Sequence, residues 1–261
     1  MKEHVWIPNG RDGRLSAMVH VAEGVEAAPV VVVCHGFTGE KAGPNQLYIR
    51  LTNALTARGA HAIRFDFTGS GESDGEFRTD TTVTRWMEDL RQVVRWTRER
   101  EPFRHAPIVL LGHSLGGYVV LQYDDESAPI AGVIALAPIV EPVANVRDTI
   151  LGPELWARSL AGHPISNFYG KGFTLDPQFV EDLLAHRSAI GRPSALPLLL
   201  VHGTSDAAVP AAGSEALFAG YRGPKELALI EGADHVFRDH ADVVRARVER
   251  WMERIAPTRG A

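Results

Sequence analysis

The chain has 261 residues, of which 45% are hydrophobic, which suffices for one α/β domain with a sizeable core, or for such a domain with a modest insertion. Its net charge of −5 and its lack of a strongly basic block argue against nucleic acid or a membrane as the main partner. The sequence shows no signal-peptide pattern and no apolar run near the roughly 20 residues of a membrane span. Its single cysteine is Cys34, so we expect a cytoplasmic protein without disulfides.

Strands and helices alternate along most of the chain. Residues 5–7 and 15–21 predict an opening β-hairpin, because Asn-Gly and Asp-Gly turn signals lie between them. Residues 30–34, four valines followed by Cys34, form a continuous apolar run that is typical of a strand buried on both faces. The alternation implies a mostly parallel sheet covered on both faces by helices. Further strands are predicted at 60–65, 108–111, 130–136, 198–201 and 227–230, and helices at 45–58, 81–100, 211–220 and 239–255.

One long segment breaks this alternation. About sixty residues follow Pro138 before the next strand, where a direct helical crossover needs far fewer. We interpret residues 138–190 as an inserted cap, with a short helix, a hairpin near 167–175 and a helix at 177–187. Residues 1–137 and 191–261 then form the core. The cap aromatics either line a substrate pocket or only anchor the cap, and the candidates for substrate binding are Trp156, Phe168, Tyr169 and Phe173.

The stretch from Gly112 to Gly116, with the sequence GHSLG, is the most informative motif of the chain. It follows an apolar strand and precedes a helix-like run. Strand, G-x-S-x-G and helix in succession predict a nucleophile elbow. Its turn is so tight that the serine is strained and glycine must stand two residues to either side. The hydroxyl of Ser114 then points out of the sheet, where a base can reach it.

A serine hydroxyl is a weak nucleophile that needs a base, and the base needs a third group to orient it. Functional groups of such sheets gather at the carboxyl ends of the strands, and the last two predicted strands run into loops that contain Asp206 and His235. We assign Ser114 as nucleophile, His235 as base and Asp206 as acid. Asp234 is the alternative acid, disfavoured because a residue adjacent to the histidine usually points elsewhere.

The oxyanion formed by the attacked carbonyl needs backbone N–H donors. One is expected from Leu115, the residue after the nucleophile. The other is expected from Phe37, in the loop after the predicted strand at 30–34, and its side chain is then free to line the pocket. His35 and His113 flank the site, and we expect structural or pocket-lining roles for them.

Several of these stretches together carry a family resemblance: HGFTG at 35–39, DFTGSGESDG at 66–75, GHSLG at 112–116, HGTSD at 202–206 and EGADH at 231–235. The chain resembles the α/β-hydrolase superfamily over nearly its whole length and, more narrowly, bacterial cinnamoyl and feruloyl esterases and related small carboxylesterases. The resemblance implies a mostly parallel eight-stranded sheet with helices on both faces and a small cap after the sixth strand.

The predicted function is a serine carboxylic-ester hydrolase that acts through an acyl-enzyme on a small-molecule ester with a short or aromatic acyl group. The pocket is expected to be narrow and apolar, lined by Phe37, Leu115 and cap aromatics. Thioester or amide cleavage and acyl transfer use the same groups and stay open. A non-catalytic binding protein is a remote alternative, because all three triad positions are filled.

The chain has no H-E-x-x-H motif or cysteine pair, so no metal or other cofactor is expected. The oligomeric state is not determined by the sequence, and a homodimer is compatible with it.

Overall fold

An eight-stranded sheet forms the centre of the computed structural model, which describes residues 1–25 and 28–255. The first strand pairs antiparallel with the second and the second with the fourth, and all other pairs are parallel. This architecture confirms the predicted fold class. In spatial order the strands are β1 (Lys2–Pro8), β2 (Arg14–His20), β4 (His61–Phe65), β3 (Val30–Cys34), β5 (Ile108–His113), β6 (Gly132–Leu136), β9 (Leu198–Gly203) and β10 (Lys225–Ile230).

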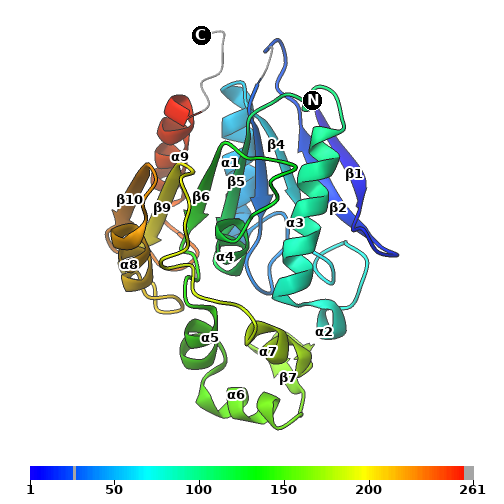
Figure 1. Ribbon diagram of the computed structural model, residues 1–261, viewed down its shortest axis with the longest axis vertical. Helices are drawn as coiled ribbons and strands as arrows, with labels where there is room; N and C mark the ends of the chain where they lie inside the picture. Colours follow the sequence, from blue (N-terminus) through cyan, green and yellow to red (C-terminus); the bar gives the residue numbers. More distant parts are fainter. Residues whose placement is uncertain (26–27, 256–261) are drawn as a thin grey trace.

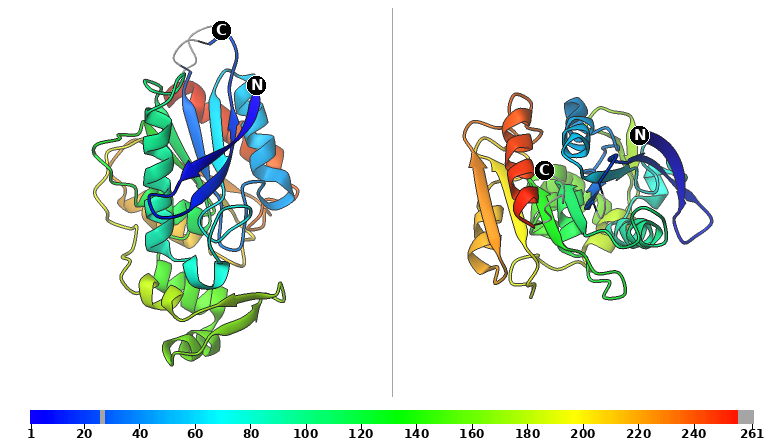
Figure 2. Two further views of the ribbon diagram at one scale, coloured as in Figure 1. Left: turned by 90° about the vertical axis from the view of Figure 1, so that its right-hand side faces the viewer. Right: turned by 90° about the horizontal axis from the view of Figure 1, so that it is seen from above.

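Helices cover both faces of this sheet (Figures 1 and 2). Two helices, α1 (Leu47–Ala57) and α9 (Ala241–Ile255), pack on one face and share one apolar cluster with the sheet. The other face packs against α3 (Val83–Arg98), α4 (Leu115–Leu121) and α8 (Ala212–Gly220), which contribute to a second cluster. The sheet is thus the middle of three layers, and its functional groups can meet only at its ends.

The sequence of β3 explains why this strand is central. Val30 and Val32 join one apolar cluster, and Val31 and Val33 join the other. All four are at most 1% exposed. Side chains of a strand alternate between faces, so a strand covered on both sides must be apolar throughout. Fully burying one valine contributes on the order of 1.5–3 kcal/mol.

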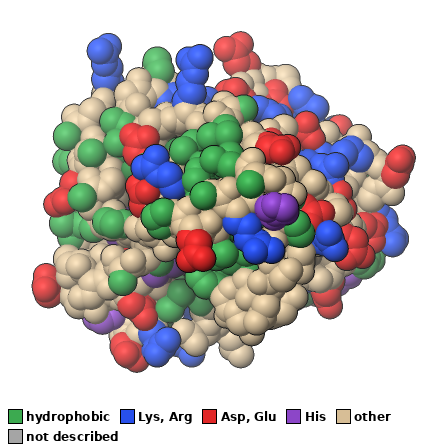
Figure 3. Space-filling view, turned by 90° about the horizontal axis from the view of Figure 1, so that it is seen from below, with side chains coloured by type: hydrophobic (Ala, Val, Ile, Leu, Met, Phe, Trp, Pro, Cys, Tyr) green, Lys and Arg blue, Asp and Glu red, His purple; other side chains and the backbone are tan. Residues whose placement is uncertain are grey.

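The segment between β6 and β9 folds outside this sandwich, at the end of the sheet where the parallel strands finish (Figure 1). It contains the hairpin expected near 167–175, whereas the expected helix at 177–187 is shorter. Figure 3 looks onto this end and shows hydrophobic side chains gathered near its centre among charged ones. The elements are α5 (Pro142–Asn145), the π-helical η2 (Val146–Leu151), α6 (Pro153–Leu160), β7 (Ile165–Phe168), β8 (Phe173–Leu175) and α7 (Gln178–Leu183).

Both ends of this segment are joined to each other. The amide of Ala189 donates to the carbonyl of Val140 at 2.8 Å. Beside it, the Ser188 hydroxyl donates to the Glu141 carboxylate at 2.6 Å. The chain therefore leaves the core and returns to it at a single place.

The start of α1 differs from the prediction. The helical pattern begins at residue 45, but Asn45 and Gln46 have φ angles of 48° and 60°. These left-handed residues belong to a short 3₁₀ turn, η1 (Pro44–Gln46), so that the α-helix begins at Leu47. Apolar spacing indicates the helix face but not this local backbone conformation. As a result the α-helix is preceded by a turn instead of continuing back to residue 45.

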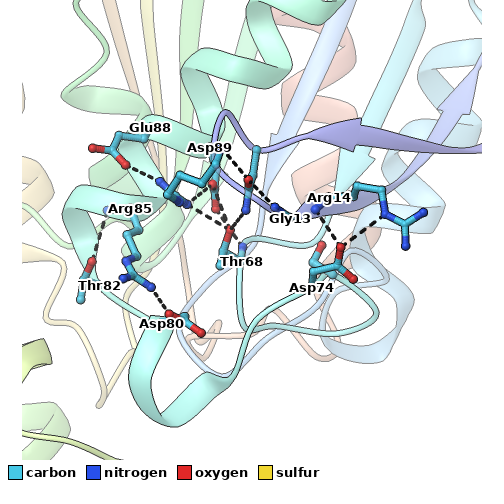
Figure 4. A network of polar contacts seen from close by, with 12 residues as sticks. Gly13, Arg14, Thr68, Asp74, Asp80, Thr82, Arg85, Glu88 and Asp89 are labelled. Carbon is cyan, nitrogen blue, oxygen red and sulfur yellow. Dashed lines mark hydrogen bonds and ion pairs between the residues drawn. The ribbon is translucent and has the colours of Figure 1, made fainter.

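A buried polar network fixes the turn of the β1–β2 hairpin to α3 (Figure 4). Asp89 of α3 is fully buried and accepts hydrogen bonds at 2.8 Å from the Thr68 amide and from the Arg11 guanidinium. Glu88 binds the same arginine at the surface.

No helix within residues 1–25 and 28–255 has the length and apolarity needed to cross a membrane.

Candidate active site

Ser114 lies at the turn between β5 and α4 with φ 56° and ψ −119°, a conformation that costs a non-glycine residue of order 1–3 kcal/mol. The sheet and helix hold it there. Its amide donates to the carbonyl of Leu136 at 3.0 Å, and its carbonyl accepts from the amides of Tyr118 and Ile139, each at 3.1 Å. The predicted strand, turn and helix are therefore present, and the serine is strained.

The two flanking glycines permit this turn. A Cβ on Gly112 would lie 2.2 Å from the carbonyl oxygen of Gly116, and one on Gly116 would lie 2.2 Å from that of His35. Both distances are far inside van der Waals contact, and the atoms met are backbone. Any larger residue at either position would force the backbone around Ser114 to move.

His235 and Asp206 come together at the ends of β9 and β10. Nδ1 of His235 lies 2.7 Å from Oδ2 of Asp206, and Oδ1 of Asp206 accepts from the amides of Ala208 and Val209. Burial alone would raise the pKa of Asp206, but hydrogen bonds from His202 and His235 hold the pKa well below its usual range. Asp206 therefore stays ionised and orients His235 by its far nitrogen.

His202 is a second histidine on the same carboxylate, and its partners became clear only in the structure. Its Nε2 lies 2.8 Å from the Val209 carbonyl and 3.2 Å from Oδ2 of Asp206. Its Nδ1 accepts from the Ser214 hydroxyl at 2.7 Å. The only signal in the sequence was its place at the end of the strand before Asp206.

Asp234 points into its own loop. Its Oδ1 accepts hydrogen bonds from the amides of Val236 at 3.2 Å and Arg238 at 3.0 Å. These bonds shape the turn that carries His235, and the ring of His235 is bonded to Asp206 instead. The geometry favours Asp206 as the orienting acid.

Hydrogen bonds to the carbonyl oxygen of Gly36 fix the orientation of the peptide between Gly36 and Phe37. The Gly36 oxygen accepts from Nδ1 of His35 at 2.8 Å and from the Gly39 amide at 3.0 Å, while Nε2 of His35 accepts from the Phe67 amide. Because carbonyl and N–H point in opposite directions in a trans peptide, the Phe37 N–H is fixed as well.

Both expected oxyanion donors are free. Within residues 1–25 and 28–255, the amides of Phe37 and Leu115 donate to no acceptor. Leu115 is the first residue of α4, where the backbone N–H has no partner inside the helix. These two N–H groups are thus available to an incoming oxyanion.

A cavity of about 500 Å³ lies in front of Ser114 and His235. Its wall combines the loop after β3, the segment before α1, the triad loops and the cap. Several wall residues were not singled out from the sequence, because they come from loops distant in the chain. The wall consists of Gly36, Phe37, Thr38, Gly39, Glu40, Gly43, Pro44, Tyr48, His113, Ser114, Ile150, Tyr169, Lys171, Ala208, Val209, His235 and Val236.

Among the four cap candidates, Tyr169 alone is on this wall. Trp156 and Phe168 are buried in the apolar cluster, and Phe173 packs against Phe77 with ring centres 4.5 Å apart. Leu115, expected to line the pocket, is 1% exposed and absent from the wall. The pocket-lining expectation is corrected for Leu115, and the three other cap aromatics anchor the cap instead of lining the cavity. The cap reaches the cavity wall through Ile150, Tyr169 and Lys171.

The Phe37 side chain contacts both the cavity and the cap. It is on the cavity wall, and it also stacks on Phe179 of α7 with ring centres 4.8 Å apart. Phe168 and Phe77 lie at 5.5 and 5.6 Å from the same ring. The loop that carries Phe37, the expected oxyanion donor, is thereby packed against the cap.

Comparisons with known proteins agree with this architecture. The sequence signature of the family described as "Serine aminopeptidase, S33" matches residues 25–195. Monoacylglycerol lipase of Mycolicibacterium smegmatis is 30% identical over 216 residues, which cover 72% of this chain and 74% of that protein. Uncharacterized protein YfhR of Salmonella typhimurium is 29% identical over 212 residues, which cover 80% of this chain but 65% of that protein's length. The structure of Est1E from Butyrivibrio proteoclasticus with bound ferulic acid is 25% identical, with a TM-score of 0.83, and the match covers 96% of this chain and 98% of that one.

Proposed function

Since the chain belongs to the serine aminopeptidase S33 family and is a serine hydrolase with the α/β-hydrolase fold, we propose that it hydrolyses carboxylic esters with short or aromatic acyl groups through an acyl-enzyme. One observation carries this proposal. Ser114, on a strained elbow, shares a cavity wall with His235, whose Nδ1 lies 2.7 Å from Asp206. Nucleophile, base and orienting acid are the groups that acyl transfer requires.

In the proposed reaction the hydroxyl oxygen of Ser114 attacks the ester carbonyl while Nε2 of His235 takes its proton. The carbonyl oxygen becomes an oxyanion that the amides of Phe37 and Leu115 stabilise. The C–O bond to the alcohol then breaks, and His235 returns the proton to the leaving oxygen. A water molecule, deprotonated by His235, then attacks the acyl carbonyl. The C–O bond to Ser114 breaks, His235 returns the proton to the serine oxygen, and the acid is released.

The choice of acyl group rests on the cavity and on the relatives. Phe37, Ile150 and Val209 give the wall apolar surface, and Tyr169 adds an aromatic ring from the cap. The similarity to a ferulic acid complex favours an aromatic acyl group. The similarity to a monoacylglycerol lipase makes glyceride esters the principal competitor.

An activity-based probe tests the nucleophile. A fluorophosphonate should label the wild-type chain at Ser114, and Ser114→Ala should abolish labelling. His235→Ala should slow labelling by several orders of magnitude, because the hydroxyl then lacks its base. In ester hydrolysis the double variant should lose little more kcat than either single variant, since the residues act as a unit. Labelling at another residue would contradict the assignment.

A substrate panel tests the acyl preference. It contains p-nitrophenyl esters of rising chain length, methyl ferulate, a monoacylglycerol, an acyl-CoA and an amino-acid p-nitroanilide. We expect the highest kcat/KM with the short p-nitrophenyl esters or methyl ferulate. Highest activity on the monoacylglycerol, on the acyl-CoA or on the anilide would replace the proposed ester class by a lipase, a thioesterase or an amidase. Adding an alcohol as acceptor separates hydrolysis from acyl transfer.

A further inference from the structure

His113, the residue just before the nucleophile, makes two hydrogen bonds that the reaction above does not use. Its Nε2 lies 2.8 Å from the main-chain oxygen of His235, and its Nδ1 lies 3.0 Å from the Tyr48 hydroxyl. A carbonyl oxygen only accepts, so Nε2 carries the hydrogen and Nδ1 accepts from Tyr48. The hydroxyl of Tyr48 thereby selects the tautomer of His113 that can donate to His235.

The protonation states of this chain of hydrogen bonds are stable. His113 is 4% exposed, and burial, followed by the neighbouring His235, lowers its pKa to about 3. Burial raises the pKa of Tyr48 far above its usual value. Tyr48 therefore stays protonated and His113 stays neutral throughout the ordinary pH range, and the direction of both hydrogen bonds is fixed.

His235 is consequently held at two points. Asp206 binds its ring at 2.7 Å, and His113 binds its main-chain oxygen from the other side of the site. The amide of Ser205 also donates to the Ala233 carbonyl, so the loop of His235 is tied to the loop after β9. The hydrogen bond from His113 is the one that ties the backbone of His235 directly to β5, which ends in the elbow. Because a misplacement of about 1 Å can cost on the order of a hundredfold in rate, such a restraint bears on catalysis.

We propose that His113 is a positioning residue: with its tautomer selected by Tyr48, it holds the backbone of His235 in register with Ser114. This inference rests on the proposed hydrolase reaction but concerns different atoms. It explains why the residue between Gly112 and Ser114 has a side chain that both donates and accepts. The ring centres of His113 and His235 lie only 4.9 Å apart, so the restraint acts directly beside the base.

Three variants test the proposal. His113→Leu removes the donor, His113→Gln keeps an N–H at the place of Nε2, and Tyr48→Phe removes only the hydroxyl that selects the tautomer. We expect His113→Leu to lower kcat on p-nitrophenyl butyrate by about 10- to 100-fold with little change in KM. His113→Gln should retain kcat within about threefold of wild type, as a preserved hydrogen bond requires.

The most specific test compares the effect of Tyr48→Phe on kcat in the wild-type and in the His113→Gln backgrounds. Glutamine has no tautomers, so Tyr48→Phe should lower kcat in the wild-type background and have no further effect in the His113→Gln background. Equal losses from Tyr48→Phe in both backgrounds would overturn the proposal. So would a His113→Gln variant that loses as much kcat as His113→Leu while both unfold at the wild-type temperature.

A direct measurement keeps this test separate from that of the proposed function. The proton between His235 and Asp206 gives a downfield NMR resonance, which should broaden or shift in His113→Leu and be retained in His113→Gln. An unchanged resonance in His113→Leu would overturn the positioning role even if the hydrolase activity were established. Wild-type protein that a fluorophosphonate fails to label would instead refute the proposed function. Tyr48→Phe deletes one oxygen, so it provides a folded variant if His113→Leu does not fold.

Discussion

At the scale of single residues, the two carboxylates near His235 bind different partners. Asp206 forms a hydrogen bond with Nδ1 of the His235 ring, whereas Asp234 accepts hydrogen bonds from the amides of its own turn. Although the two residues lie beside the same histidine, only Asp206 is placed to stabilise the imidazolium that the proposed reaction would form. The difference lies in the direction of the side chains.

We predict that Asp206→Asn lowers kcat by roughly 10⁴, because an amide favours the wrong tautomer of the base. Asp234→Asn keeps an oxygen that accepts from the loop amides and should cost less than tenfold. Steady-state hydrolysis of p-nitrophenyl butyrate by the two matched variants measures both effects. The reverse ranking would transfer the acid to Asp234.

Sequence reasoning located Ser114, Asp206 and His235 because each follows an apolar strand, and parallel strands bring their carboxyl ends together. It did not find the contact of Tyr48 with His113, since 65 positions separate them and α1 meets β5 only in the folded chain. It also offered Phe168 as a candidate for the cavity wall, whereas the ring lies in the interior. Whether an aromatic ring faces a cavity or a core depends on backbone angles of a turn, which composition does not encode.

At the scale of elements, the turn between β7 and β8 determines which cap side chains reach the substrate. Asn167 and Tyr169 have φ angles of 53°, and the Asn167 side chain accepts from the Gly172 amide at 3.0 Å. The Tyr169 hydroxyl donates to the Ile150 carbonyl at 3.2 Å. This geometry turns Tyr169 and Lys171 onto the cavity wall while Phe168 remains in the interior.

Adjacent residues of this hairpin should therefore respond differently to truncation. Phe168→Ala is expected to destabilise the fold by about 3 kcal/mol or more, because a buried ring leaves a cavity. Tyr169→Ala should change the ratio of kcat/KM between methyl ferulate and p-nitrophenyl acetate with a small effect on melting temperature. Calorimetry and the two assays separate the effects. A changed ratio in Phe168→Ala with an unchanged melting temperature would contradict this division.

The network between the N-terminal hairpin and α3 predicts a pH dependence of stability (Figure 4). Burial raises the pKa of Asp89 to about 6 despite its hydrogen bonds from Thr68 and Arg11. An unfolded aspartate titrates near 3.9, so between about pH 4 and 6 the folded chain binds more protons than the unfolded chain. Stability contributed by Asp89 is present below pH 4 and is lost as the pH rises through 6.

Asp89→Asn should flatten this dependence. Urea unfolding between pH 4 and pH 7 is expected to show a smaller fall in the free energy of unfolding for the variant than for the wild type. Glu88→Gln, which removes a surface carboxylate bound to the same Arg11, is the matched control. Parallel profiles for Asp89→Asn and the wild type would contradict the predicted role of Asp89.

At the scale of the whole molecule, the layered architecture was predictable because it rests on periodicity. The apolar run at residues 30–34 and the helical spacing in 81–100 each specify which faces are buried, and the structure places helices accordingly. The prediction was least accurate where no periodicity exists. The start of α1 shifted by two residues, because Asn45 and Gln46 adopt left-handed angles that no apolar pattern records.

The joined ends of the cap have an evolutionary consequence. Because Ala189 returns to within one hydrogen bond of Val140, a segment of a different length could leave and rejoin the core at the same place. Loop length itself adds little entropic cost, about 0.6 kcal/mol for each doubling. A change of this one contiguous stretch of the gene would therefore alter the cavity wall at Ile150, Tyr169 and Lys171, provided that the new segment still packs against Phe37.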